Sequence, residues 1–348
     1  MPGAAPSLIS LKDGPSQPVS LFIVNRSGAR VVVQRIVTFT MNPAVDVSST
    51  VGHIVASHKL RCGNVRHDAG GGGINVARVV KRLGGNPLAI FPAGGPMGAL
   101  LERLVLAENV PYLAIPITND TREDFTVSET STGAQYRFVL PGPELSEAET
   151  AACLNAATRN LERGSFLVAS GSLPPNVSDN FYASLGRHAA EAGVRFVLDT
   201  SGTPLKAALS GTPFLIKPSQ SELGQIAGAV LSNRKQCIAA AQEIVQSGRA
   251  GYVAVSLGSD GAVLVGKECS FSALAPRVNS RTTVGAGDSF LASLILAFSR
   301  GLNAAQALKQ AVAAGSAALL ATGTGLCARD DVERLAAQVT VQELGTSS

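Results

Sequence analysis

This 348-residue sequence predicts an α/β fold in which a doubly wound, mostly parallel sheet carries helices on both faces. Short strands rich in valine, isoleucine and leucine alternate with amphipathic helices, which is the pattern of βαβ units. Two segments near 45–60 and 125–140 alternate differently and do not fit that sheet, so we expect them to form a small separate sheet. The length allows one large or two smaller domains with a substantial core, and a hydrophobic content of 45% is ordinary for a globular α/β protein.

The elements follow one another in a regular order. A buried strand is expected at 36–41, and a helix at 74–84 follows the first alternating segment. Gly133 provides the turn of a hairpin between 125–131 and 135–140, and Asp260-Gly261 begins a second hairpin. The other expected elements are strands at 88–91, 166–169, 195–199, 214–217, 252–256 and 262–265, and helices at 97–109, 146–162, 178–192, 233–248, 287–300 and 303–320.

Charge and hydropathy exclude two classes of partner. The net charge is +4, but the basic residues are scattered, which argues against a nucleic acid. No apolar run approaches the roughly 20 residues that span a membrane. The five cysteines lie far apart without C-x-x-C spacing, which is typical of reduced thiols in a cytoplasmic protein. We expect an N-terminal extension at 1–34, without a secretory signal and partly disordered where proline, glycine and serine are dense.

The most informative motif is Thr-Thr-Val-Gly-Ala-Gly-Asp at 282–288, directly before an amphipathic helix. Gly285 and Gly287 leave little side chain over the first turn, so its free N–H groups and the helix dipole suit an anion such as a transferring phosphoryl group. Asp288 would repel that anion, and a general base acting on an attacking hydroxyl would explain its presence. On local evidence alone, an aspartate that caps a helix is an equally good interpretation.

A second glycine run, at 70–73, precedes another predicted helix. An ordinary turn needs one or two glycines, so four in a row predict a very close approach of the backbone to other atoms. Asn75 then offers an amide that could bind a sugar hydroxyl. Neither run is one of the commoner nucleotide motifs, since the third glycine of G-x-G-x-x-G is missing and no G-x-x-x-x-G-K-[ST] occurs.

Gly-Gly-Gly-Gly-Ile-Asn-Val-Ala-Arg at 70–78 and Thr-Val-Gly-Ala-Gly-Asp at 283–288 resemble the two signatures of the PfkB/ribokinase family of sugar kinases. The resemblance continues in order through 42–46, 59–62, 90–95, 135–142, 170–175, 255–258 and 313–318. It implies a ribokinase-like kinase domain at 35–335 with a lid from about 45–60 and 122–140, followed by a C-terminal tail at 336–348. The sequence looks most similar to the bacterial PfkB-type 6-phosphofructokinases, which implies ATP-dependent phosphorylation of fructose 6-phosphate at its 1-hydroxyl in glycolysis.

The resemblance also implies a sugar-phosphate site. Arg122 and Arg137 would hold the 6-phosphate because arginine grips phosphate bidentately. Lys59 and Arg61 would help, across a homodimer formed through the lid. Asp46 would take two sugar hydroxyls, although a turn-forming aspartate is the plainer interpretation. The implied substrate-binding set is Asp46, Lys59, Arg61, Gly71, Gly72, Asn75, Arg122, Arg137 and Ser172.

On the nucleotide side, the resemblance implies that Glu222 holds Mg²⁺-bound water and that Ser219 replaces the family's usual Asn. It also implies a K⁺ site at Thr282, Val284, Ala318, Ala321 and Gly323, served by backbone carbonyls. In the implied transfer, Asp288 accepts the proton of the attacking hydroxyl while the N–H groups of Gly285, Ala286 and Gly287 stabilise the phosphoryl oxygens. The implied ATP-binding set is Lys217, Ser219, Glu222, Ser256, Gly258, Gly261, Thr283, Val312 and Ser316.

Several alternatives compete with this interpretation. Gly287-Asp288-Ser289 mimics the start of a lipase motif, but that chemistry needs a histidine base and none of the four histidines follows the motif. A catalytically silent sugar-phosphate sensor would have no use for Asp288. Kinases of tagatose 6-phosphate or fructose 1-phosphate remain open, because these sugars differ from fructose 6-phosphate by one stereocentre or by the phosphate position.

Overall fold

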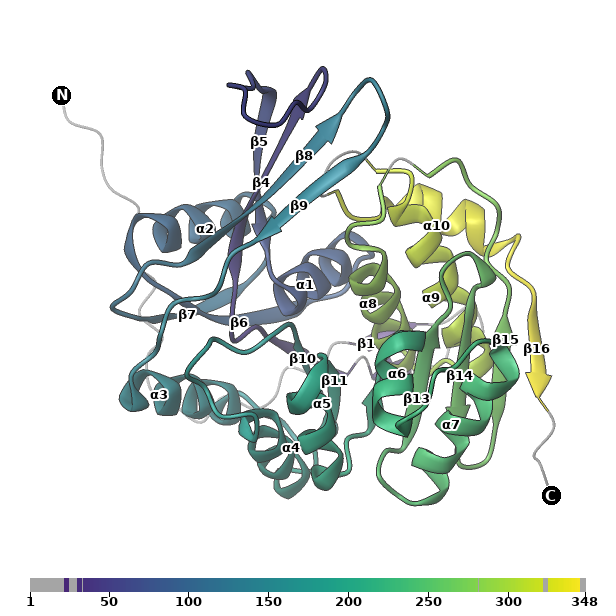
Figure 1. Cartoon of the computed structure of the whole chain (residues 1–348). Helices are drawn as coiled ribbons and strands as arrows, with labels where there is room; N and C mark the ends of the chain where they lie inside the picture. The colour runs from purple at the N-terminus through teal and green to yellow at the C-terminus, as the bar shows by residue number, and fades with distance from the viewer. Residues whose placement is uncertain (1–21, 25–29, 33, 281, 322–324, 345–348) are drawn as a thin grey trace.

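The computed structural model describes residues 22–24, 30–32, 34–280, 282–321 and 325–344, and for the first two of these ranges the backbone only. A ten-stranded sheet forms the body and a four-stranded sheet rises from it (Figure 1). Strands β1 (Phe22–Val24) and β2 (Arg30–Val32) pair with each other before the body begins. Among the described residues, no helix combines the length and apolar character that a membrane crossing requires.

The body follows the predicted βα alternation. Its order is β16-β15-β14-β13-β12-β11-β10-β3-β6-β7, parallel from β13 to β7 and antiparallel from β13 to β16. Its strands are β3 (Ile36–Phe39), β6 (Pro87–Ala93), β7 (Tyr112–Pro116), β10 (Phe166–Ser170), β11 (Arg195–Asp199), β12 (Leu215–Ile216), β13 (Tyr252–Ser256), β14 (Ala262–Gly266), β15 (Ser270–Ala273) and β16 (Val341–Leu344).

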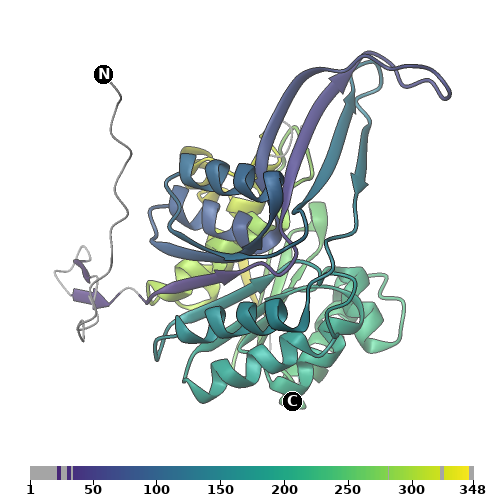
Figure 2. The same cartoon turned by 90° about the vertical axis from the view of Figure 1, so that its left-hand side faces the viewer.

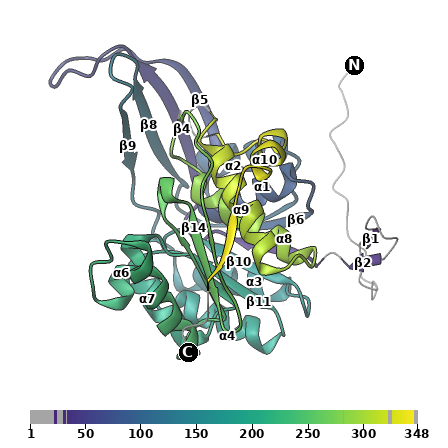
Figure 3. The same ribbon diagram turned by 90° about the vertical axis from the view of Figure 1, so that its right-hand side faces the viewer.

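Helices cover both faces because strand residues alternate between two cores. In β10, Phe166 and Val168 pack in one core, and Leu167 and Ala169 pack in the other. Figure 3 shows α8 and α9 on one side of the sheet and α4, α6 and α7 on the other. The first face carries α1 (Gly72–Arg82), α8 (Ala286–Ser299), α9 (Ala304–Ala318) and α10 (Arg329–Ala336), and the second carries α3 (Glu147–Arg159), α4 (Phe181–Glu191), α5 (Gly202–Ala208), α6 (Gln220–Ala227) and α7 (Arg234–Gln246).

The separate sheet, which we call the lid, has the order β5-β4-β8-β9 and projects away from the body (Figure 2). It consists of β4 (Ala44–Val51), β5 (Gly63–Gly70), β8 (Arg122–Glu129) and β9 (Gln135–Val139). Its root packs through Val45 and Ala69 against α1 and α2 (Gly95–Ala107). The lid strands therefore begin or end where the body sheet presents the carboxyl ends of β3 and β10.

Three predicted boundaries differ from the structure. The lid extends past residue 60 through β5. We did not predict this strand, because most of it is polar and exposed and so lacks an apolar pattern. The segment 336–348, predicted as a tail, contributes β16, which pairs with β15 over Ser270 to Ala273. Helix α10 lies between 303–320 and that strand, where we predicted no helix, and it buries Val332 and Leu335. In the first two cases pairing with distant residues stabilises a segment whose own pattern is weak. Helix α10 instead carries the apolar spacing i, i+3, i+4 at Val332, Leu335 and Ala336, a local signal that the sequence analysis overlooked.

Candidate active site

The N-terminus of α8 lies beside α1 at the centre of the molecule (Figure 1). Its N-cap, Gly285, has a left-handed φ of 74° and no side chain to cap the helix. A Cβ there would also meet Leu326 Cδ2 at 2.6 Å. The first N–H bonded within the helix is that of Ser289, which donates to the Gly285 carbonyl at 2.9 Å. The N–H groups of Ala286, Gly287 and Asp288 precede that bond, so this end of the helix can bind an anion.

Asp288 stands in the first turn of α8 and is partly exposed. Asn75 Nδ2 donates to its Oδ2 at 3.0 Å. Burial and the nearby Asp199 raise the pKa of Asp288 to about 6, against the opposing effects of Asn75, Lys217 and Arg137. A carboxyl with such a pKa is ionised at neutral pH and still a good proton acceptor, which suits a general base.

Asp199 is a site residue that the sequence analysis missed. It ends β11, and Lys217 follows the neighbouring parallel strand β12, so both stand at the carboxyl edge of the sheet, where open α/β sheets bind ligands. Lys217 Nζ pairs with Asp199 Oδ1 at 3.1 Å, and Ser170 Oγ donates to Asp199 Oδ2 at 3.4 Å. A charged residue at the end of each of two predicted strands, 195–199 and 214–217, was the available signal.

Lys217 reaches the same space as Asp288. A Cβ on Gly287 would lie 3.5 Å from Lys217 Nζ, so the ammonium faces the first turn of α8. Burial would lower the pKa of Lys217, but Asp199, Asp288 and Glu222 outweigh it and raise that pKa. The site thus holds a permanent cation beside an open helix N-terminus, an arrangement that stabilises an anion.

The four glycines at 70–73 do approach other atoms closely, and those atoms belong to the protein. A Cβ on Gly70 would stand 2.3 Å from Asp46 Oδ1, and one on Gly72 would stand 2.2 Å from Ser170 Oγ. Gly71 has a φ of 104°, which favours glycine. The run therefore lets α1 begin against β3, β4 and β10, and it brings Asp46 and Asn75 to one side of the site.

Three carboxylates lie side by side at the root of the lid, with arginines close to them. Asp46 of β4 pairs across the strands with Asp68 of β5 and Asp124 of β8, so the three carboxylates form a row. Burial and the charge of Asp124 raise the pKa of Asp46 to about 7, against the arginines nearby. Arg137 is exposed on β9 and influences Asp46, Asp124 and Asp288 alike.

Arg122 lies at the edge of this row. Its Nη1 donates to Asp124 Oδ1 at 3.0 Å and to the Leu140 carbonyl at 2.9 Å, and its Nη2 donates to the Asn42 carbonyl at 3.3 Å. Its buried Nε has no hydrogen-bond partner within the described part of the chain. The side chain is thus held in place at the root of the lid with one donor unused.

Of the remaining residues predicted for the sugar site, the structure places one near the root of the lid and two in an exposed connection. Ser172 is exposed and accepts a hydrogen bond from Asn42 Nδ2 at 3.2 Å, near the root of the lid. Lys59 and Arg61 are exposed in the connection between β4 and β5. Within the described ranges, no hydrogen bond or ion pair joins either residue to Asp46 or Asp288. A single chain does not bring these two cations into the site.

Ser219 and Glu222 form a capping box at the start of α6. Ser219 Oγ accepts from the Glu222 N–H at 3.3 Å, and Glu222 Oε2 accepts from the Ser219 N–H at 2.7 Å. The spacing S-x-x-E is the sequence signature of this motif, so the sequence could have indicated it. The replacement of Asn by Ser therefore preserves the helix start, while Glu222 stays close enough to influence Asp199 and Lys217.

The other predicted nucleotide and K⁺ residues surround the C-terminal half of the body. Ser256 pairs with Ser219 as an isolated parallel bridge, which brings the ends of β12 and β13 together. Gly258 and Gly261 flank the turn after β13 with left-handed φ values of 59° and 92°. Gly323 lies outside the described residues. Of the rest, Thr283 is exposed, Ala321 is half-buried, and the buried ones are Thr282, Val284, Val312, Ser316 and Ala318.

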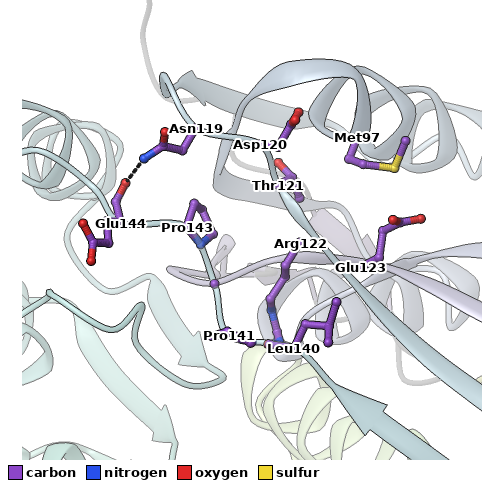
Figure 4. A pocket seen from close by; sticks show the side chains of 11 residues that line it. Met97, Asn119, Asp120, Thr121, Arg122, Glu123, Leu140, Pro141, Pro143 and Glu144 are labelled. Atoms are coloured by element: carbon purple, nitrogen blue, oxygen red, sulfur yellow. Dashed lines mark hydrogen bonds between the residues drawn. The ribbon is translucent and has the colours of Figure 1, made fainter.

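A cavity of about 510 Å³ lies at the root of the lid (Figure 4). It is lined by Met97 of α2, by residues 119–123, which include Arg122, and by the segment 140–144, and Asp288 is not among them. Asp120, Glu123 and Glu144 place carboxyl groups around it, and Arg122 is the cation among its lining residues. Asn119 Nδ2 closes one side by donating to the Glu144 carbonyl at 2.8 Å.

Comparison with known proteins matches the model of the pfkB family of carbohydrate kinases over residues 40–331. The chain belongs to the pfkB family. The ATP-dependent 6-phosphofructokinase isozyme 2 of Mycobacterium tuberculosis is 45% identical over 86% of this chain and 88% of that protein. The 1-phosphofructokinase of Borreliella burgdorferi is 33% identical over 90% of this chain and all of that protein.

Solved structures agree with the fold. The crystal structure of phosphofructokinase-2 from Escherichia coli with fructose-6-phosphate has a TM-score of 0.83 and 39% identity, covering 88% of this chain and 99% of that one. Structures of the same E. coli protein with potassium and in a tetrameric inhibited form have TM-scores of 0.85 and 0.83, at 41% and 40% identity and the same coverage. This pfkB kinase therefore has the ribokinase-like fold that the sequence predicted.

Membership of a carbohydrate kinase family implies ATP and a metal ion, and the residues present fit both. The open N-terminus of α8 and the Lys217 ammonium suit phosphate oxygens. Within the described ranges, no group of three or more histidine, cysteine or acidic side chains could enclose a metal ion. A hard cation that keeps several waters would suit Glu222 and Asp199, which both lie near Lys217, together with substrate phosphates.

Proposed function

We propose that this pfkB kinase transfers the γ-phosphoryl group of ATP to the 1-hydroxyl of fructose 6-phosphate and yields fructose 1,6-bisphosphate. The observation that carries the proposal is the Asp288 carboxylate, with its pKa raised to about 6, at an open helix N-terminus beside Lys217. The relatives named 6-phosphofructokinase, together with the arginines at the root of the lid, support a sugar that already bears a phosphate.

In the proposed reaction, Asp288 Oδ1 or Oδ2 accepts the proton of the sugar 1-hydroxyl as its oxygen attacks phosphorus in line. The N–H groups of Gly285, Ala286 and Gly287 stabilise the charge on the equatorial phosphoryl oxygens, and Lys217 adds a cation on the same side. Asp199 holds Lys217 in place. Bound Mg²⁺ would neutralise phosphate charge, with Glu222 holding one of its waters and Asp199 nearby, and K⁺ would sit near Thr282 and Ala318.

The sugar would lie under the lid. Asp46 would accept hydrogen bonds from two hydroxyls, with Gly71, Gly72, Asn75 and Ser172 around the ring. Arg122 offers its unused Nε and Arg137 its exposed guanidinium to the 6-phosphate. Because Lys59 and Arg61 stay outside the site of one chain, we propose that a second copy supplies them through a lid-to-lid dimer. Exposed apolar side chains at Phe125, Tyr136 and Phe138 support that contact.

A panel of phosphosugars scored by ADP release tests this function. Fructose 6-phosphate should give the highest kcat/KM, above tagatose 6-phosphate, fructose 1-phosphate and unphosphorylated fructose. A preference for fructose 1-phosphate or tagatose 6-phosphate would move the chain to another activity of the same family. Sugar-phosphate binding without any ADP release would instead identify a sensor and would refute the kinase mechanism.

A further inference from the structure

Arg78 is buried at the centre of the molecule, one turn after Asn75 on α1, and no role is yet assigned to it. Its relative exposure is 1%, and it is the largest of the fully buried side chains in the described chain. Burying an arginine is unfavourable unless its donors are paired. Here Nε donates to Glu108 Oε1 at 2.6 Å, and Nη1 donates to the Ala69 carbonyl at 2.6 Å and to Asn75 Oδ1 at 3.0 Å. Nη2 forms an ion pair with Glu108 Oε1 at 2.5 Å but makes no hydrogen bond among the described residues.

The contact with Asn75 connects Arg78 to the site. Arginine can only donate and an ionised carboxylate can only accept, whereas an amide has one end of each kind. Arg78 bonds to the oxygen of Asn75, and the nitrogen of Asn75 donates to Asp288 Oδ2 at 3.0 Å. The three side chains thus form a chain of hydrogen bonds with one direction, from α1 to α8.

We propose that Arg78 is a positioning residue that prevents the amide of Asn75 from flipping, so that Nδ2 always faces Asp288. This role rests on the proposed function, in which Asp288 becomes protonated as the sugar hydroxyl attacks. A free amide could then turn its oxygen toward the new O–H of Asp288 and accept a hydrogen bond from it. Arg78 already occupies that oxygen, so Asn75 can only donate to Asp288, and this hydrogen bond is stronger to the ionised carboxylate than to the neutral carboxyl.

The consequence is a base that is restored to its ionised form after each turnover. A hydrogen bond to the charged form of an acid lowers its pKa, and one to the neutral form raises it. The charged groups that face Asp288 are Asp199 from β11, Lys217 after β12 and Arg137 from β9. None of them contacts the amide of Asn75, so Arg78 alone acts on its orientation among the described residues.

The test is the pH profile of kcat with saturating fructose 6-phosphate and MgATP for wild type and Arg78→Lys. Lysine keeps the buried charge that Glu108 needs, but one ammonium lacks the fork that spans Glu108, Ala69 and Asn75. We expect the acid limb of the profile to move up by roughly half a pH unit to one unit, the size of one hydrogen bond. The loss in kcat should be larger at pH 6 than at pH 8, with KM for ATP unchanged.

Arg82 provides a matched control one turn further along α1. It shares Glu108, with Nη2 at 2.8 Å from Oε2, but its other contact is the Leu326 carbonyl. Arg82→Lys should leave the acid limb where it is. In an Asn75→Ala background, Arg78→Lys should add no further shift, because the amide through which it acts is gone.

An unmoved acid limb in Arg78→Lys, or an equal shift with and without Asn75, would overturn the positioning role. Should Arg78→Lys not fold, the double variant Arg78→Met with Glu108→Gln removes both members of the buried pair and must show the same shift. The proposed function fails separately, if Asp288→Asn remains active, since the acid limb would then belong to another group.

Discussion

Replacing Asp288 by asparagine should abolish turnover and at the same time stabilise the protein. The variant keeps its size and can turn its amide oxygen toward Asn75 Nδ2, so the fold around α8 should persist. It cannot accept the proton of the sugar hydroxyl. A positioned general base contributes roughly 10²–10⁴-fold in rate, so kcat should fall by at least about 100-fold.

The stabilisation follows from the raised pKa. The pKa of Asp288 rises from 3.8 to about 6 on folding, so the native state binds this proton more tightly than the unfolded chain does. Wild type therefore loses stability as the pH rises from about 4 to about 6, and the full loss is present above that range. At 1.36 kcal/mol per pKa unit the loss is about 3 kcal/mol. Asparagine is neutral at every pH and avoids it.

Urea unfolding of both forms at pH 8 and pH 5 measures this difference. The variant should be more stable by up to about 3 kcal/mol at pH 8, and by about half of that at pH 5, where the native carboxyl is largely protonated. Asp179→Asn, at an exposed carboxylate, is the control and should change neither activity nor stability. A kcat above a tenth of wild type would refute the assignment of Asp288 as the base. A stability gain that does not shrink at pH 5 would refute its raised pKa.

Three further outcomes are expected. Arg122→Ala should raise KM for fructose 6-phosphate by roughly 10–100-fold, the value of one charge-assisted contact, and leave KM for ATP nearly unchanged; a selective loss of ATP affinity would reverse the two halves of the site. KM for fructose 6-phosphate should rise as the pH falls below about 7, because the pKa of Asp46 is raised to about 7 and the ionised form accepts hydrogen bonds from two hydroxyls more strongly than the neutral form does. A KM independent of pH between 6 and 8 would contradict that role. Ser219→Asn should be tolerated, since asparagine caps helices as well as serine does. A magnesium titration should show that the variant needs less Mg²⁺ for half-maximal rate, by the equivalent of about 0.5–1.5 kcal/mol. A higher Mg²⁺ requirement would show that the metal site is rebuilt.

The sequence by itself determined the fold class, and it singled out Asp288 as the residue that we propose as the base. Strand and helix periodicity is a local property, and most of the predicted body elements appear in the structure close to their expected ranges. The two glycine runs also predicted correctly where the backbone needs glycine. Gly285 is a left-handed N-cap, and a side chain at Gly70 or Gly72 would collide with neighbouring atoms. The capping box at Ser219 and Glu222 was also encoded locally, although we predicted a metal-site role there instead.

Only the tertiary structure decided which polar groups meet. Asn75 and Asp288 are 213 residues apart in the chain, and their hydrogen bond exists because α1 and α8 pack side by side. The pairing of β11 with β12 brings Asp199 to Lys217, and the register of β4 with β8 sets Asp46 against Asp124. The raised pKa values of Asp288 and Asp46 arise from those meetings and from burial. No local pattern carries such information, because the charge that a carboxylate feels is set by neighbours that folding alone brings within a few ångströms.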